Sequence, residues 1–74
     1  MTTVYKLPFC HQCDRTIELM DLLEIPYSTV DLSENHAARE YVRDHLGYAQ
    51  APVVVTEDDS WSGFKADRIR ELAE

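Results

Sequence analysis

Cys10 and Cys13 are the only two cysteines of this 74-residue chain, and they stand in the order Cys-His-Gln-Cys. A strand-like run over residues 3–6 leads into the pair, and a helix-like run over residues 11–24, with apolar residues at helical spacing, leads out of it. Cys10 is therefore expected at a helix start, where free N–H groups and the helix dipole favour a thiolate, the reactive form of cysteine. Because Cys13 falls in the first turn, within reach of Cys10, the spacing favours reversible dithiol–disulfide chemistry.

Two other uses of a Cys-x-x-Cys pair fit the sequence less well. Structural zinc needs two further Cys or His ligands. No cysteine remains, and the three histidines, His11, His36 and His45, show no His-x3–5-His spacing. A purely structural disulfide across so short a loop removes little entropy from the unfolded chain. The pair is therefore interpreted as redox-active, and no metal site is predicted.

The composition indicates one domain, residues 1–74, near the lower size limit for an independent core. The net charge of −7 argues against nucleic acid and against anionic membrane surfaces as partners. The N-terminal residues lack the apolar stretch of a signal peptide, and no run approaches the length of a membrane span. We therefore expect a cytoplasmic protein, in a compartment where a Cys-x-x-Cys pair is more often catalytic than structural.

The chain as a whole predicts the element order β-α-β-α-β-β-α. Strands are expected at residues 3–6, 27–32, 53–55 and 60–62, and helices at residues 11–24, 34–46 and 65–73. Pro26 ends the first helix, Ser33 is expected to cap the second, and Gly47 ends it. The first two strands should be parallel, through a right-handed crossover, and the last two should form an antiparallel hairpin. This predicts an α/β fold, a four-stranded mixed sheet with helices on both faces.

A proline marks the second part of the expected site, in the segment Gln50-Ala51-Pro52-Val53. Because proline cannot donate to a sheet ladder, Pro52 is expected at the first residue of the strand that follows. The residues alone favour a trans peptide bond before it, since only about one X–Pro bond in twenty is cis.

With these elements in order, the chain resembles the thioredoxin/glutaredoxin superfamily and, within it, the NrdH-type redoxins. Three segments carry the resemblance: Cys10-His11-Gln12-Cys13, the run from Gly47 to Val54, and Trp61-Ser62-Gly63-Phe64. The resemblance spans nearly the whole chain and implies a minimal thioredoxin fold. It also implies that Cys10 attacks the partner disulfide, that Cys13 resolves the mixed disulfide, and that Pro52 is a cis-proline facing the cysteines.

The resemblance further implies the route of the electrons. Such redoxins are reduced by thioredoxin reductase and donate electrons to class Ib ribonucleotide reductase, here to its large subunit. No bound cofactor is expected, because the Cys10–Cys13 pair carries the electrons itself and NADPH contributes only through the reductase. The protein is expected to act as a monomer.

A partner-binding surface around the cysteines is also implied. Its expected members are Pro8, His11, Gln12, Gln50, Ala51, Pro52, Trp61, Ser62, Gly63 and Phe64. Trp61 is expected to face the partner, and Phe64 is expected to be the more buried of the two aromatic residues. His11 is interpreted as exposed and without influence on Cys10 at neutral pH, where an unperturbed histidine is mostly neutral.

The resemblance is imperfect just before the cysteines, where Lys6-Leu7 replaces the usual Thr-Lys. A shift of one residue should turn the lysine to the opposite face of the extended chain. Glutathione carries two carboxylates that need cations and free N–H groups, so with Leu7 in this place we expect thioredoxin reductase as the reductant. Two alternatives remain open: a glutathione-dependent glutaredoxin, and an iron–sulfur or zinc carrier that uses Cys10.

Overall fold

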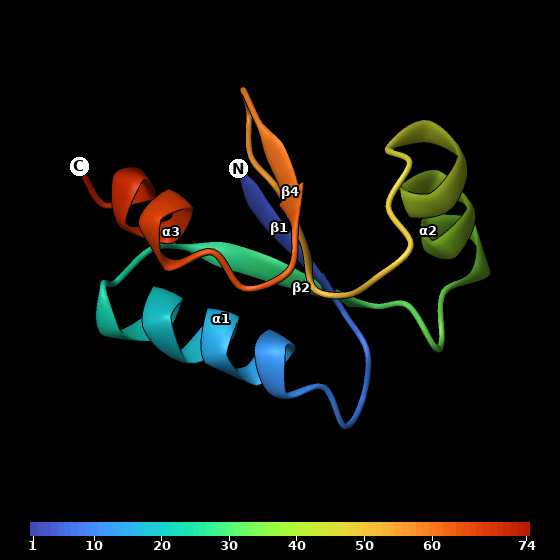
Figure 1. The fold of residues 1–74 in the computed structure, drawn as a ribbon, viewed down its shortest axis with the longest axis horizontal. Helices are drawn as coiled ribbons and strands as arrows, with labels where there is room; N and C mark the ends of the chain where they lie inside the picture. The colour runs from blue at the N-terminus through green and yellow to red at the C-terminus, as the bar shows by residue number, and fades with distance from the viewer.

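Four strands form one mixed sheet in the order β2-β1-β3-β4 (Figure 1). The computed structural model describes all 74 residues and places the strands at β1 (Thr2–Lys6), β2 (Tyr27–Asp31), β3 (Val53–Val55) and β4 (Ser60–Ser62). Strand β1 pairs parallel with β2 and antiparallel with β3, and β3 and β4 form an antiparallel hairpin. The predicted mixed sheet is therefore confirmed.

The helices cover both faces of this sheet, as predicted. Helices α1 (His11–Leu22) and α3 (Ala66–Leu72) lie on one side, and α2 (His36–Glu40) lies on the other (Figure 1). A single π-helical turn, η1 (Tyr41–His45), extends α2. No helix combines the length and the apolar character that a membrane span would require.

Strand β3 divides the apolar core into two layers. Successive side chains of a strand point to opposite faces of the sheet, so Val54 packs towards α1 and α3, and Val53 packs towards α2. The larger cluster comprises Val4, Met20, Ile25, Val54, Trp61 and Ile69, and the smaller one comprises Leu32, Val42 and Val53. Burial on both faces explains why β3 is a continuous valine run without polar alternation.

The ends of five predicted elements need correction. Helix α1 ends at Leu22, earlier than residue 24, and Glu24 takes a left-handed conformation with φ 58° in the turn that leads to Pro26. The predicted helix over residues 34–46 is shorter and in two parts, because η1 replaces its second half with a π turn. Strand β2 ends one residue early, at Asp31, β1 begins one residue early, and α3 is one residue shorter at each end.

The cap of α2 was also predicted at the wrong residue. Asn35, not Ser33, is the N-cap, and its Oδ1 accepts a hydrogen bond from the N–H of Ala38 at 3.0 Å. Ser33 instead donates from its hydroxyl and its N–H to the carboxylate of Asp31, at 2.6 and 2.8 Å. This local turn satisfies the Ser33 side chain before the helix begins.

Candidate active site

The two cysteines form a disulfide at the start of α1, with their Cα atoms 5.2 Å apart. Cys10 is the N-cap residue, and the N–H of Cys13 donates to its Sγ at 3.2 Å. Cys10 is half-buried, whereas only 1% of Cys13 is exposed. In the reduced state the same N–H stabilises a thiolate on Cys10, because it lies at the positive end of the helix. The predicted position of Cys10 at a helix start is confirmed.

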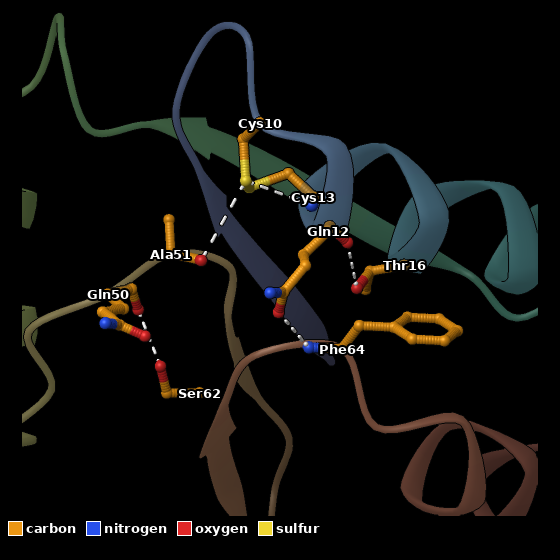
Figure 2. The surroundings of a disulfide bond; sticks show 8 residues. All are labelled: Cys10, Gln12, Cys13, Thr16, Gln50, Ala51, Ser62 and Phe64. Atoms are coloured by element: carbon orange, nitrogen blue, oxygen red, sulfur yellow. Dashed lines mark hydrogen bonds between the residues drawn. A yellow bond between two sulfur atoms is a disulfide. The ribbon is translucent and has the colours of Figure 1, made fainter.

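A cis peptide bond between Ala51 and Pro52 places the loop before β3 opposite the disulfide (Figure 2). The carbonyl oxygen of Ala51 lies 4.0 Å from Cys10 Sγ. This is a contact in the disulfide form, since the sulfur then carries no proton, and a weak hydrogen bond becomes available once Cys10 is a thiol. The cis-proline implied by the family resemblance is therefore confirmed, against the trans bond favoured by base rates.

Two hydrogen bonds hold this loop to the end of β4. The Ser62 hydroxyl donates to the carbonyl of Gln50 at 2.7 Å (Figure 2), and the N–H of Gly63 donates to the carbonyl of Pro52 at 2.8 Å. The residue between them, Ala51, donates its N–H to no carbonyl of the chain. The backbone of Ala51 is therefore fixed on both sides and is itself free to pair with an extended segment.

Gln12 connects α1 to the turn before α3. Its Oε1 accepts a hydrogen bond from the N–H of Phe64 at 3.0 Å, as Figure 2 shows. The guanidinium of Arg15 lies over the ring of Phe64, 4.9 Å from its centroid. Gly63, with φ 89°, allows the close turn that brings Phe64 to Gln12. Gln12, Gly63 and Phe64 therefore do come together beside the cysteines.

Trp61 does not face outwards, so its predicted exposure is wrong. Only 3% of Trp61 is exposed, Phe64 is half-buried, and the expected order of burial is thus reversed. Trp61 pairs with Val54 across the β3–β4 hairpin and shares its inner face, while the neighbouring serines point to the other face. Its Nε1 is buried without a hydrogen-bond acceptor in the protein, and the Arg68 guanidinium lies 5.5 Å from the centroid of its ring.

The remaining predicted residues lie around the disulfide. Pro8 and His11 are exposed on either side of Phe9 and Cys10, and Pro52, the last residue of the loop before β3, is buried. Lys6 is paired in register with Asp31. The hydrogen bonds from Ser33 are the main cause of the lowered pKa of the Asp31 carboxyl, and the charge of Lys6 contributes less. Nowhere do three or more His, Cys, Asp or Glu side chains gather in a way that could hold a metal ion.

Two features of the site were not predicted from the sequence. Phe9, directly before the attacking cysteine, is fully exposed and has a left-handed backbone with φ 57°, which is uncommon outside glycine. Second, Arg39 and Arg43 line a groove that also contains Leu7 and Ala51. The adjacency of Phe9 to Cys10 was visible in the sequence, but the approach of the two arginines depends on where α2 packs.

A half-buried cysteine at a helix start, disulfide-bonded to a buried cysteine and faced by a cis-proline, defines a thiol–disulfide oxidoreductase site. The profile of the Glutaredoxin family matches residues 2–61. The Gene 56 protein of Mycobacterium phage D29 is 35% identical over 71 residues, which cover 95% of this chain and 79% of that protein. The glutaredoxin-like protein NrdH of Escherichia coli K12 is 34% identical over 70 residues, covering 95% and 85%.

A solved structure shows the same likeness in three dimensions. The NrdH-redoxin of Escherichia coli superposes with a TM-score of 0.92 at 34% identity, over 96% of this chain and 92% of that one. This confirms the predicted thioredoxin-like fold. The chain therefore belongs to the glutaredoxin family, as a NrdH-type redoxin.

Proposed function

We propose that this redoxin reduces a disulfide in the large subunit of class Ib ribonucleotide reductase and is itself reduced by thioredoxin reductase. The observation that supports a protein as the substrate is the unpaired backbone of Ala51, which lies beside the half-buried Cys10. An extended segment of the partner pairs with this backbone as an added strand and brings its disulfide to Cys10. The similar NrdH-redoxin of Escherichia coli has a thioredoxin-like activity profile, which supports the choice of reductase.

The reaction runs through two exchanges at the cysteines. The Cys10 thiolate attacks one sulfur of the partner disulfide, so that a mixed disulfide forms and the other partner sulfur leaves as a thiolate. Cys13 then loses its proton and attacks Cys10 Sγ, which releases the second partner sulfur and closes the Cys10–Cys13 disulfide. The partner gains two electrons and two protons, and the reductase restores the dithiol at the expense of NADPH.

The surroundings of the two cysteines support the roles proposed for them. Cys10 is the accessible residue and receives the N–H of Cys13, so it is the better thiolate and the attacking group. Cys13 is buried and reaches only Cys10, which makes it the resolving group. No bound cofactor is needed for these steps. In this proposal the protein acts as a monomer in the cytoplasm, the compartment that contains the reductase and its NADPH.

The surface that meets the partner surrounds Cys10. Pro8, His11 and Gln50 are exposed near the disulfide, and Phe9 joins them as an exposed aromatic contact. Gln12, Ser62, Gly63 and Phe64 position the neighbouring loops by the hydrogen bonds already described. Trp61 supports this surface from within the core and does not contact the partner.

Glutathione-dependent reduction is a second candidate, because Arg39 and Arg43 line the groove beside Ala51 and carry the charge that a glutathione carboxylate requires. The hydrogen bond of Gln12 argues against glutathione binding. The N–H of Phe64 already donates to Gln12 Oε1, so it is not free for a glutathione carboxylate. A coupled assay decides between the two candidates. It follows NADPH consumption with a small disulfide as acceptor, in one arm with thioredoxin reductase and in the other with glutathione and glutathione reductase. We expect faster turnover with thioredoxin reductase, and equal or faster turnover with glutathione would identify a glutaredoxin.

A further inference from the structure

A groove of about 280 Å³ runs between α2 with η1 on one side and the loop that leads to β3 on the other. Its walls are mainly apolar, and it is lined by Leu7, Leu32, Arg39, Val42, Arg43, Tyr48, Ala49, Gln50 and Ala51. Ala51 is also the residue whose carbonyl lies 4.0 Å from Cys10 Sγ. Ala51 is therefore a neighbour of both the groove and the reactive disulfide.

The charge of the groove is opposite to that of the whole protein. The chain has fourteen acidic residues against seven basic ones, yet both charged residues of the groove lining are arginines. Arg39 and Arg43 are four positions apart, so they project from the same side of the helical segment. Arg39 takes part in none of the ion pairs of the structure.

Arg43 is available to a ligand as well. It donates two hydrogen bonds to the adjacent Asp44, from Nε to Oδ1 at 2.9 Å and from Nη2 to Oδ2 at 3.3 Å, and the two side chains are 67% and 58% exposed. A guanidinium has five N–H donors and this exposed pair uses two of them, so the remaining donors can bind a second anion. Two arginines above an apolar floor suit a segment that carries both a carboxylate and an apolar side chain.

We propose that this groove binds the segment next to the partner's disulfide, and that it selects an acidic residue there. The inference rests on the proposed function and names the part of the substrate that the site recognises. The apolar side chain of the segment packs on Leu32, Val42 and Tyr48, while its carboxylate meets Arg39 and Arg43. Because the segment pairs as a strand at Ala51, only every second side chain points into the groove. The acidic and the apolar residue should therefore lie an even number of positions apart.

The test uses the full-length protein, reduced beforehand and freed of reductant, so that no reductase is needed. Its oxidants are short synthetic peptides, each with one intramolecular disulfide and a single Glu placed at successive positions from the cysteine. Each has a partner peptide with Gln in place of Glu. The second-order rate constant of oxidation of the protein is measured for every pair. The variants are Arg39→Gln, Arg43→Gln and the double variant.

The matched control is Arg70→Gln, because it removes the same charge from α3, where Arg70 lies 3.6 Å from Asp67 and outside the groove. With the unsubstituted protein, we expect the best Glu peptide to react about three- to tenfold faster than its Gln partner, because exposed ion pairs are individually weak and only two of them form. The preference should fall towards onefold in the double variant and remain in the control. It should also fall towards onefold at about 1 M salt, where charges are screened within about 3 Å.

Three outcomes would overturn the proposal. Equal rates with Glu and Gln peptides at every position would show that the groove does not select an acidic residue, and would leave the proposed redox function intact. A failure to react with any peptide would reject the proposed function and the groove together. If the double variant slowed oxidation by glutathione disulfide but not by the Glu peptides, the groove would be a glutathione site.

Discussion

Replacing Trp61 by alanine tests whether this residue belongs to the core or to the docking surface. Trp61 is 3% exposed and packs in the larger core cluster, so the substitution deletes a buried aromatic side chain. Such truncations cost about 3–5 kcal/mol. We expect the lower end, about 3 kcal/mol, because the change also removes an indole N–H that has no acceptor.

This loss is large for so small a protein. At about 0.05–0.15 kcal/mol per residue, a chain of 74 residues has a total stability of about 4–11 kcal/mol. A loss of about 3 kcal/mol should lower the midpoint of thermal unfolding by about 12–24 °C. The variant should nevertheless stay mostly folded at about 10–20 °C, where the stability of proteins is usually greatest.

The assay combines unfolding with transfer kinetics. Because Trp61 is the only tryptophan, unfolding is followed by far-ultraviolet circular dichroism, and not by fluorescence. The rate of peptide disulfide reduction is measured at the low temperature, per folded molecule, and we expect it to stay close to that of the unchanged protein. An unchanged melting midpoint together with a slower transfer rate would refute the buried role of Trp61.

Three further predictions concern residues around the site and the sheet. Phe9→Ala should show the opposite pattern to Trp61→Ala, since its exposed ring adds nothing to the core: an unfolding midpoint near that of the unchanged protein and a slower reduction of protein disulfides. Gln12→Ala removes the hydrogen bond to Phe64, so we expect a loss of about 0.5–1.5 kcal/mol in urea unfolding and faster exchange of the Phe64 amide proton in NMR; an unchanged exchange rate would contradict this contact. The pKa of Asp31 is lowered, mainly by the hydrogen bond from the Ser33 hydroxyl. The ionised carboxylate therefore stabilises the folded protein at pH values above the unfolded pKa of about 3.9. This stabilisation is lost as the pH falls through the pKa of Asp31 in the folded protein. Asp31→Asn should therefore make the urea midpoint fall less steeply with acid, and an equally steep fall would argue against it.

The element order could be predicted because each signal is local. The valine run after Pro52, the helical spacing after Cys10 and the proline at residue 26 each specify one element without help from the rest of the chain. The prediction of Ser33 as the cap of α2 was wrong, because Asn35, two residues later, is an equally suitable cap residue. The hydrogen bonds from Ser33 to Asp31 decide between them, and they form only at the end of β2.

The positions of the site residues could be predicted where a motif specifies them, and less well where packing decides. The spacing of Cys10 and Cys13 predicted their position at the helix start, whereas the cis bond before Pro52 was implied only by the family resemblance. The burial of Trp61 depends on its register against Val54, although the alternation Ser-Trp-Ser already separated it from the serines. Arg39 reaches the site only because α2 packs beside the loop before β3, and no local pattern encodes that contact.

Trapping of the mixed disulfide shows which cysteine attacks the partner and whether the large subunit is a substrate. Reduced Cys13→Ser protein is mixed with the oxidised large subunit of class Ib ribonucleotide reductase, and the products are separated without reductant and mapped by mass spectrometry. We expect a stable adduct through Cys10, since the resolving thiol is absent, and no adduct when Cys10→Ser is used instead. An adduct through Cys13 in the Cys10→Ser protein, or none with either variant, would contradict this expectation.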